Sequence, residues 1–287
     1  MTTTTTLSDA LRMHSHPAKL PDQSEYRSIG GRTIFQLATQ FHLTPLEVEQ
    51  AALINNVVPE RYARNFKTYS LMEQVRLLRS TVAVVGLGGL GGTVVEILAR
   101  TGVGCMHLID GDSFAEHNLN RQLTSNCRNL GTPKSYAAQN RVATINPSLK
   151  VHVHSKFLNA ANAARLINSA DVIVDCLDNI KTRFILAKSA KIIGCPMVSA
   201  AVGGLYGHVT TIFPDDENLD MIYGKESASP STGAETSLGC LPQIVMMIAA
   251  IQSSEVFKLL LQRGRVLRNR LLVVDLEDNT LETLQLC

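Results

Sequence analysis

The 287-residue sequence predicts an α/β protein with a Rossmann-like, doubly wound, mostly parallel sheet that is extended by antiparallel strands. A small N-terminal helical region precedes this sheet. The first observation is a β-rich run at 81–85, followed by a glycine-rich turn, a helical stretch and a second strand at 106–110, which together form a βαβ unit. Helical and β-rich segments then alternate to residue 193, which favours parallel strands. Finally, two closing β-rich segments are spaced for a hairpin, whose strands must be antiparallel.

The N-terminal part is predicted in two pieces. Residues 1–28 are polar, rich in threonine near their start and without apolar periodicity, so they predict a mobile tail. Residues 29–58 predict a small helical accessory region with helices at 33–40 and from Pro45, where Thr44 and Glu47 form a capping box. The apolar spacing is typical of a helix-turn-helix, yet residues 31–58 hold one arginine against two glutamates. That charge favours an accessory or dimer-contact module over a DNA reader.

Residues 59–287 are predicted to form the main domain. A capping box from Ser70 to Glu73 opens a helix that ends near residue 79, just before the first strand. A long loop is expected at 215–239, and the final hairpin is expected to turn at Asp278-Asn279. The other expected helices are 93–100, 133–145, 160–167, 180–193 and 242–261, and the other expected strands are 151–154, 171–176, 196–201, 207–213, 271–276 and 281–286.

The composition excludes several classes of protein. Lysine and arginine number 27 against 25 acidic residues, a net charge of +2 without a basic stripe, so nucleic acid is not an expected partner. The longest apolar run, 244–251, is much shorter than the roughly 20 residues of a membrane span, and the N-terminus has no signal-like core. The six cysteines lie singly, which indicates buried or free thiols in a reducing compartment. We therefore expect a cytoplasmic protein.

The glycine-rich turn predicts a nucleotide site. Gly86, Gly88, Gly89 and Gly91 follow a strand and open a helix, where backbone N–H groups can approach a phosphate. Asp110 ends the next strand, 19 residues after Gly91, where a carboxylate can accept hydrogen bonds from a ribose. Tight packing and a turn cap would explain either feature alone, so it is the combination that favours nucleotide binding.

The following segment supplies the charges that phosphorus chemistry needs. Arg121 can donate two hydrogen bonds to phosphate oxygens, and Lys134 adds a positive charge in the first turn of a helix. Asp178 lies beyond the end of a parallel strand, where it can hold Mg²⁺ against phosphates. Asp175 and Arg183 are interpreted as structural or ion-pairing residues.

These motifs resemble the ThiF/MoeB/HesA family, relatives of the ubiquitin-activating enzymes, from about residue 59 to residue 286. The resemblance rests on several motifs in the family's order and spacing: Arg61-Tyr-Ala-Arg64-Asn65, Gly86-x-Gly88-Gly89-x-Gly91, Asp110-Gly-Asp112, Asn118-Leu-Asn-Arg121-Gln122, Gly131-x-Pro-Lys134 and Asp175-x-x-Asp178-Asn179-x-x-Thr182-Arg183. It implies ATP-dependent adenylation of the C-terminal glycine of a ubiquitin-like sulfur carrier of the ThiS or MoaD type, with release of pyrophosphate. Carriers of thiamine, molybdopterin and tungstopterin synthesis are all compatible with these motifs.

The resemblance also assigns roles to residues. Asp110 would hold the ribose, Arg121 and Lys134 the phosphates, and Asp178 the magnesium ion. Arg64 would reach the partner subunit's site, which requires a homodimer. The glycines, with Asp112, Asn118 and Gln122, would complete the nucleotide site. A carboxylate nucleophile is already ionised at neutral pH, so no histidine base is needed.

The sequence departs from the family pattern in one respect. Many members carry two Cys-x-x-Cys pairs that bind zinc, and this sequence has none, so no zinc is expected and loop 215–239 is expected to be mobile. Cys240 is the nearby candidate for a thioester or acyl-disulfide, although its leucine neighbours favour a buried packing residue. The arginines at 263, 265, 268 and 270 favour a solvated loop over a contact for an acidic carrier. Any sulfur donor would be a separate protein.

Other functions remain open at this stage. A nicotinamide-dependent oxidoreductase would use the same βαβ unit but would leave Arg121, Lys134 and Asp178 without a role. A tRNA-modifying dehydratase that adenylates a carboxylate also resembles the family, although the near-neutral charge does not favour a tRNA substrate. A non-catalytic ATP-binding scaffold or a DNA-binding regulator is the third alternative.

Overall fold

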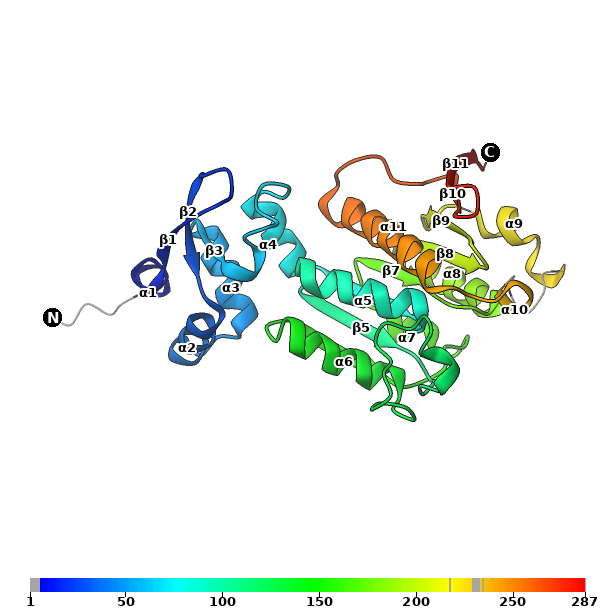
Figure 1. Cartoon of the computed structure of the whole chain (residues 1–287), viewed down its shortest axis with the longest axis horizontal. Coiled ribbons are helices and arrows are strands. Elements are labelled where there is room, and N and C mark those ends of the chain that lie inside the picture. Colours follow the sequence, from blue (N-terminus) through cyan, green and yellow to red (C-terminus); the bar gives the residue numbers. More distant parts are fainter. Residues whose placement is uncertain (1–5, 217, 229–232, 234, 287) are drawn as a thin grey trace.

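An eight-stranded sheet forms the centre of the protein, as seen in a computed structural model that describes residues 6–216, 218–228, 233 and 235–286 (Figure 1). The strand order is β11-β10-β9-β8-β7-β4-β5-β6. The five parallel strands are β4 (Thr81–Val85), β5 (Cys105–Ile109), β6 (Lys150–His154), β7 (Val172–Asp175) and β8 (Met197–Gly203). The antiparallel extension is β9 (Tyr206–Ile212), β10 (Arg270–Asp275) and β11 (Thr280–Gln285). The predicted mixed, doubly wound sheet is confirmed.

Helices cover both faces of this sheet (Figure 1). One face carries α5 (Gly89–Thr101), α6 (Lys134–Ile145) and α11 (Pro242–Leu261), and the other carries α7 (Ala163–Ile167), α8 (Ile180–Ile193) and α9 (Asn218–Tyr223). Alternation along β4 explains the two layers, because Val82 and Val84 enter the first core while Ala83 and Val85 enter the second. The interval expected to be a long loop contains α9, η3 (Glu226–Ala228) and α10 (Glu235–Leu238), and its remaining positions lie partly outside the described residues.

By length and composition alone, helix α11 could cross a membrane. Its longest uninterrupted apolar run, 244–251, is much shorter than a membrane span. It packs instead against α5, β8 and β9, and 61% of its most apolar window is buried inside the protein. Ile244, Val245 and Ile248 on this helix are fully buried. A core helix that is covered on most sides needs no polar stripe, which explains its composition.

The sheet places the ends of three parallel strands at one level. Val85 at the end of β4 is in register with Ile109 of β5 and with Asp175 of β7. Strands β5 and β6 lie on one side of β4, and β7 lies on the other side. This reversal of strand order opens a crevice at the carboxyl edge of the sheet, where ligands bind in folds of this type.

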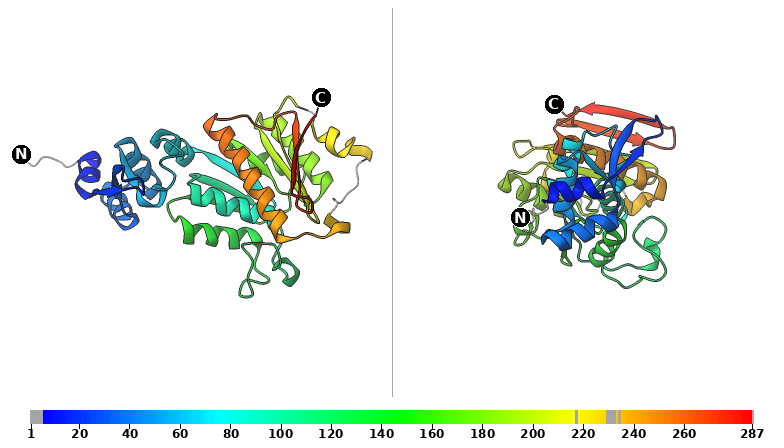
Figure 2. Two further views of the ribbon diagram at one scale, coloured as in Figure 1. Left: turned by 45° about the horizontal axis from the view of Figure 1, so that its top comes forward. Right: turned by 90° about the vertical axis from the view of Figure 1, so that its left-hand side faces the viewer.

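A separate N-terminal module lies at one end of the elongated molecule (Figure 2). Its elements are α1 (Leu7–His14), β1 (His16–Lys19), β2 (Glu25–Ile29), α2 (Gly31–Phe41), α3 (Pro45–Ile54) and β3 (Val57–Pro59). The two helices predicted in this module are confirmed, including the Thr44–Glu47 capping box.

The prediction of a mobile tail at 1–28 is wrong from residue 7 onward, and residues 1–5 lie outside the described chain. Thr6 and Asp9 form a capping box that starts α1, and Leu11 of this helix is fully buried in a cluster with Ile34 and Val48. Strands β1 and β2 pair as a hairpin, and β2 also pairs with β3. The capping box and the helical spacing of Leu7, Ala10 and Leu11 are local signals that the prediction missed, and packing against the module stabilises a helix this short.

The module joins the main domain through buried polar contacts. Glu49 of α3 accepts hydrogen bonds from Ser148 (2.8 Å) and from the Tyr62 hydroxyl (3.0 Å), and it lies 3.3 Å from the Arg61 guanidinium. Tyr62 belongs to η1 (Glu60–Tyr62), which leads toward α4 (Leu71–Arg79) and its confirmed Ser70–Glu73 capping box. Burial raises the pKa of Glu49, although Arg61 opposes that shift.

Candidate active site

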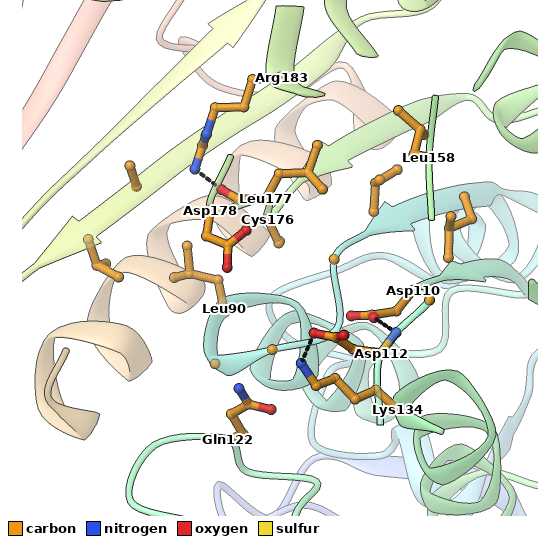
Figure 3. Close-up of a pocket in the computed structure, with 18 of the residues that line it drawn as sticks. Leu90, Asp110, Asp112, Gln122, Lys134, Leu158, Cys176, Leu177, Asp178 and Arg183 are labelled. Carbon is orange, nitrogen blue, oxygen red and sulfur yellow. Dashed lines mark hydrogen bonds and ion pairs between the residues drawn. The ribbon is translucent and has the colours of Figure 1, made fainter. Parts of the chain in front are cut away.

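A cavity of about 190 Å³ occupies the crevice at the carboxyl edge of the sheet (Figure 3). Its walls come from the segments that follow β4, β5, β6 and β7, and from the start of α11. The predicted site residues in its lining are Gly86, Gly88, Gly89, Asp110, Asp112, Arg121, Gln122, Lys134 and Asp178. The structure therefore brings together residues that lie as much as 92 positions apart, from Gly86 to Asp178.

The glycine-rich turn exposes the start of α5 to this cavity. Gly88 is the N-cap of the helix and no side chain caps it, so the first-turn N–H groups are available to an anion. Gly86 has a positive φ of 87°, and a Cβ there would lie 2.6 Å from the Cys176 carbonyl oxygen. Glycine is needed at that position because the loops after β4 and β7 touch.

Asp110 is fixed by two backbone hydrogen bonds. Its Oδ2 accepts from the Leu87 N–H and its Oδ1 accepts from the Asp112 N–H, each at 2.7 Å. Burial raises the pKa of the Asp110 carboxyl, while these two hydrogen bonds and Lys134 partly offset the shift. The carboxylate joins the glycine turn to the end of β5, where it also lines the cavity.

The cations of the cavity are only partly neutralised. Lys134 is 7% exposed, and its Nζ lies 3.0 Å from Asp112 Oδ2, an ion pair visible in Figure 3. The Arg121 guanidinium donates to neutral oxygens of His117 (3.1 Å) and Asn120 (2.9 Å), so its charge is not cancelled there. Arg121, Lys134 and Lys156 face Asp110, Asp112 and Asp178 in the lining. A triphosphate would add negative charge, which a divalent cation would offset.

Asp178 points its carboxylate into the cavity (Figure 3) and makes no hydrogen bond or ion pair within the described chain. Buried polar contacts of Asp175 and Arg183 hold the loop that carries Asp178. Asp175 Oδ2 lies 2.9 Å from Arg183 Nη1 and accepts a hydrogen bond from Ser199 at 2.7 Å, and Arg183 also donates to the Leu177 carbonyl. Both members of the Asp175–Arg183 pair are buried, which confirms their structural interpretation.

The lining fits a nucleotide with magnesium. Gln122 is buried, and its Oε1 has no hydrogen-bond partner among the described residues, which leaves an acceptor for a ligand donor in the cavity. Sequence reasoning missed Lys156, Phe157 and Leu158, which follow β6 and line the same cavity. Their position after a parallel strand was the available signal. Phe157 and Leu158 provide apolar surface suited to a base.

Three predicted site residues lie outside the cavity lining. A Cβ on Gly91 would lie 1.8 Å from the Gly86 carbonyl oxygen, so this glycine allows the turn to pack against α5. Asn118 is buried and its Oδ1 accepts from the Ala115 N–H at 2.9 Å, so it caps η2 (Glu116–Asn118). Gly91 and Asn118 thus support the loops that make the site, and their direct contact with nucleotide stays a prediction.

Arg64 is the third residue, and it is exposed. Its neighbour Asn65 donates to the Thr101 carbonyl (3.3 Å) in the last turn of α5, whereas Gly89 at the cavity begins that helix. Thirteen residues of helix separate the two ends by about 18 Å. Arg64 therefore lies far from the cavity of its own chain.

Two other features of the sequence are now placed. Cys240 is half-buried and lines the cavity just before α11, so it is less enclosed than the packing interpretation expects. Arg268 pairs with Asp215 (2.7 Å) and Asp216 (2.8 Å), and Arg263 lies 3.4 Å from Glu73. These intramolecular pairs explain two of the four clustered arginines without a carrier.

Two substitutions in the glycine-rich turn should have different effects. Gly91→Ala should lower the free energy of unfolding by about 2 kcal/mol, because its Cβ would overlap backbone 1.8 Å away. Gly88→Ala should leave the free energy of unfolding nearly unchanged, since its Cβ would meet only the Gln122 side chain at 3.5 Å. It should weaken ATP binding roughly tenfold, because the added methyl group crowds the start of α5. Thermal denaturation and calorimetric titration measure the two effects. Equal losses of stability in both variants would contradict this division.

Comparison with known proteins identifies relatives of this chain. The ThiF family model matches residues 62–287. The SAMP-activating enzyme E1 of Haloferax volcanii is 35% identical over 234 residues, which covers 78% of this chain and 84% of the relative. The adenylyltransferase and sulfurtransferase MOCS3 of Drosophila willistoni is 32% identical over 234 residues, covering 79% of this chain. The match spans about half (50%) of that longer relative.

Solved structures share the fold. The crystal structure of E. coli MccB with ATP superposes with a TM-score of 0.68 at 21% identity, covering 79% of this chain and 71% of that chain. The crystal structure of PaaA gives a TM-score of 0.66 at 22% identity, with 79% and 82% covered. At this identity the likeness concerns the fold alone.

Proposed function

Because this chain belongs to the ThiF family and is an E1-like adenylyltransferase, we propose that it uses ATP to adenylate the C-terminal glycine carboxylate of a ubiquitin-like sulfur-carrier protein. The carrier would be of the ThiS or MoaD type and pyrophosphate would be released. The observation that carries this proposal is the cavity in which Asp110, Arg121, Lys134 and Asp178 converge beside the uncapped start of α5. An oxidoreductase would have no use for the last three side chains.

The positions of these residues support the proposed roles. Asp110 would accept the ribose hydroxyl hydrogens, and the first-turn N–H groups of α5 with Arg121 and Lys134 would bind the phosphates. Asp178 would hold Mg²⁺, which when bound neutralises phosphate charge and increases the electrophilicity of phosphorus. These groups position two anions, the carrier carboxylate and ATP, that would otherwise repel each other. No proton has to be removed from the nucleophile.

A second cavity supports a polypeptide tail as the other substrate. It has a volume of about 370 Å³ and shares Asp178, Arg183, Ala201 and Val202 with the nucleotide cavity. Its remaining wall combines Gly203 and Gly207 with larger side chains, which include Tyr206, His208, Tyr223 and Leu238. A polypeptide tail in this cavity would reach the shared wall at Asp178.

The position of Arg64 supports a homodimer in which this residue acts on the partner's site. It is about 18 Å of helix away from the cavity of its own chain, and it is exposed. An exposed arginine in such a place can complete a neighbouring active site as an arginine finger. A separate protein would donate sulfur after adenylation.

The decisive experiment is ATP–pyrophosphate exchange. The purified chain should incorporate labelled pyrophosphate into ATP only when a carrier ending in Gly-Gly is present. A carrier that lacks its final glycine is the matched control and should support no exchange. Exchange that is independent of the carrier, or oxidation of a reduced nicotinamide in place of exchange, would overturn the proposal.

The raised pKa of Asp110 gives a pH prediction. The ribose contact requires the ionised carboxylate, so ATP affinity should fall as the pH is lowered from neutrality toward this raised pKa. Asp110→Asn should bind ATP about tenfold more weakly at neutral pH. Its ATP affinity should not fall further as the pH is lowered. Calorimetric titration with a non-hydrolysable ATP analogue measures both effects. If the ATP affinity of Asp110→Asn falls with pH as it does in the wild type, Asp110 does not bind the ribose.

A further inference from the structure

A cluster of histidines and one cysteine lies on the sheet outside the nucleotide cavity. Cys105 and His107 alternate along β5, and His152 and His154 alternate along the neighbouring edge strand β6. His107 is in register with His152. Since side chains two apart share one face of a strand, all four side chains are on the same face of the sheet. The intervening Met106 and Leu108 enter the apolar core on the other face.

The ligand atoms of three of these residues are close together. One ligand atom each from Cys105, His107 and His152 lies within 4.8 Å of the others. His107 Nδ1 lies 3.2 Å from His154 Nε2, and the His107 ring stacks on that of His152 with a centroid distance of 4.8 Å. In a tetrahedral zinc site, bonds of about 2.0–2.3 Å separate neighbouring ligand atoms by about 3.3–3.7 Å. Side-chain rotation can close this gap of roughly 1 Å.

The cluster is open to an ion from solution. Its four side chains are half-buried, so each keeps some exposure to solvent. The ligand atoms that the three close residues offer are imidazole nitrogens and a thiol sulfur.

We propose that Cys105, His107 and His152 bind one divalent transition-metal ion of the Zn²⁺ class, while His154 positions the His107 ring. Imidazole and thiolate are the ligands that zinc prefers, and three protein ligands leave a fourth position for water. The His107–His154 contact has the form of the second hydrogen bond that usually orients a metal-binding histidine. On binding, the Cys105 thiol gives its proton to solvent and its sulfur bonds to the metal.

The ion would link β5 to the edge strand β6. Strand β6 ends at His154, and the next residues include Lys156 and Phe157 of the nucleotide cavity. A metal here would hold that wall in place. It would also revise the expectation that the protein binds no zinc, because this site needs no Cys-x-x-Cys pairs. This proposal is independent of the adenylation proposal.

Cobalt titration of the full chain, stripped with a chelator, tests the site. Co²⁺ should produce visible ligand-field bands of a four-coordinate ion and a near-ultraviolet thiolate-to-cobalt band. Cys105→Ser should lose the thiolate band, His107→Gln and His152→Gln should lose most binding, and His154→Gln should weaken binding about tenfold. Zn²⁺ should bleach the cobalt spectrum and raise the Tm of the wild-type chain but not of Cys105→Ser.

Two exposed residues elsewhere provide matched controls. Cys127→Ser and His42→Asn should leave the cobalt spectrum unchanged. Asparagine is chosen because His42 has a left-handed backbone with φ of 54°. Circular dichroism checks that each variant is folded. A wild-type chain without ligand-field bands, or a thiolate band that survives in Cys105→Ser, would overturn the proposal.

Discussion

Asp178→Asn is expected to reduce carrier-dependent ATP–pyrophosphate exchange roughly two-hundredfold, a loss of about 3 kcal/mol of transition-state stabilisation. The Asp178 carboxylate points into the nucleotide cavity (Figure 3), and it is the acidic side chain shared by that cavity and the adjoining one. The amide keeps the size of the side chain but cannot supply the negative charge that holds Mg²⁺. Raising the magnesium concentration should therefore restore part of the exchange.

The variant should fold normally. Asp178 is exposed and has no hydrogen bond or ion pair in the part of the chain that the structure describes, so its replacement breaks no buried contact. Asp278→Asn, in the exposed turn between β10 and β11, is the control and should keep full exchange. Exchange by Asp178→Asn within a few-fold of wild type at low magnesium concentration would refute the assigned role.

Local sequence signals predicted most of the main domain because each element there has a strong pattern of its own. Strand β4 is a run of β-branched and small residues, and α8 ends at Gly194, which adopts a left-handed conformation with φ of 71°. The hairpin turn at Asn279 was also expected, and that residue has a positive φ of 55°. Such signals act over a few residues, so a single sequence reveals them.

Structure that depends on distant contacts was not predictable in the same way. Helix α1 is stabilised by burial of Leu11 against α2 and α3, and its Thr6–Asp9 capping box indicates where the helix begins but not what it packs against. The cavity wall at Phe157 and Leu158 depends on the position of β6 at the sheet edge. Arg64 was identified by resemblance, but its distance from its own cavity appears only once α5 is placed.

Arg64→Ala is expected to reduce exchange roughly a thousandfold, which is the size of effect seen when an arginine finger is removed. Its stability should be unchanged, because the side chain is exposed. ATP binding should weaken far less than exchange, since the proposed contact acts on charge that develops during transfer of the adenylyl group. Arg79→Ala, on the other side of α4 from Arg64, is the control and should retain full exchange.

Mixed dimers determine whether Arg64 acts across subunits. Subunits carrying Arg64→Ala and Asp178→Asn, with different tags, can be co-expressed and purified as a mixed pair. If Arg64 acts in trans, one site receives both intact residues and the pair should regain about half of wild-type exchange. If it acts in cis, both sites stay defective. The reciprocal pair combines a wild-type subunit with the Arg64→Ala/Asp178→Asn double variant. This pair should be inactive if Arg64 acts in trans and half-active if it acts in cis. The two mixed dimers therefore give opposite results for the two arrangements.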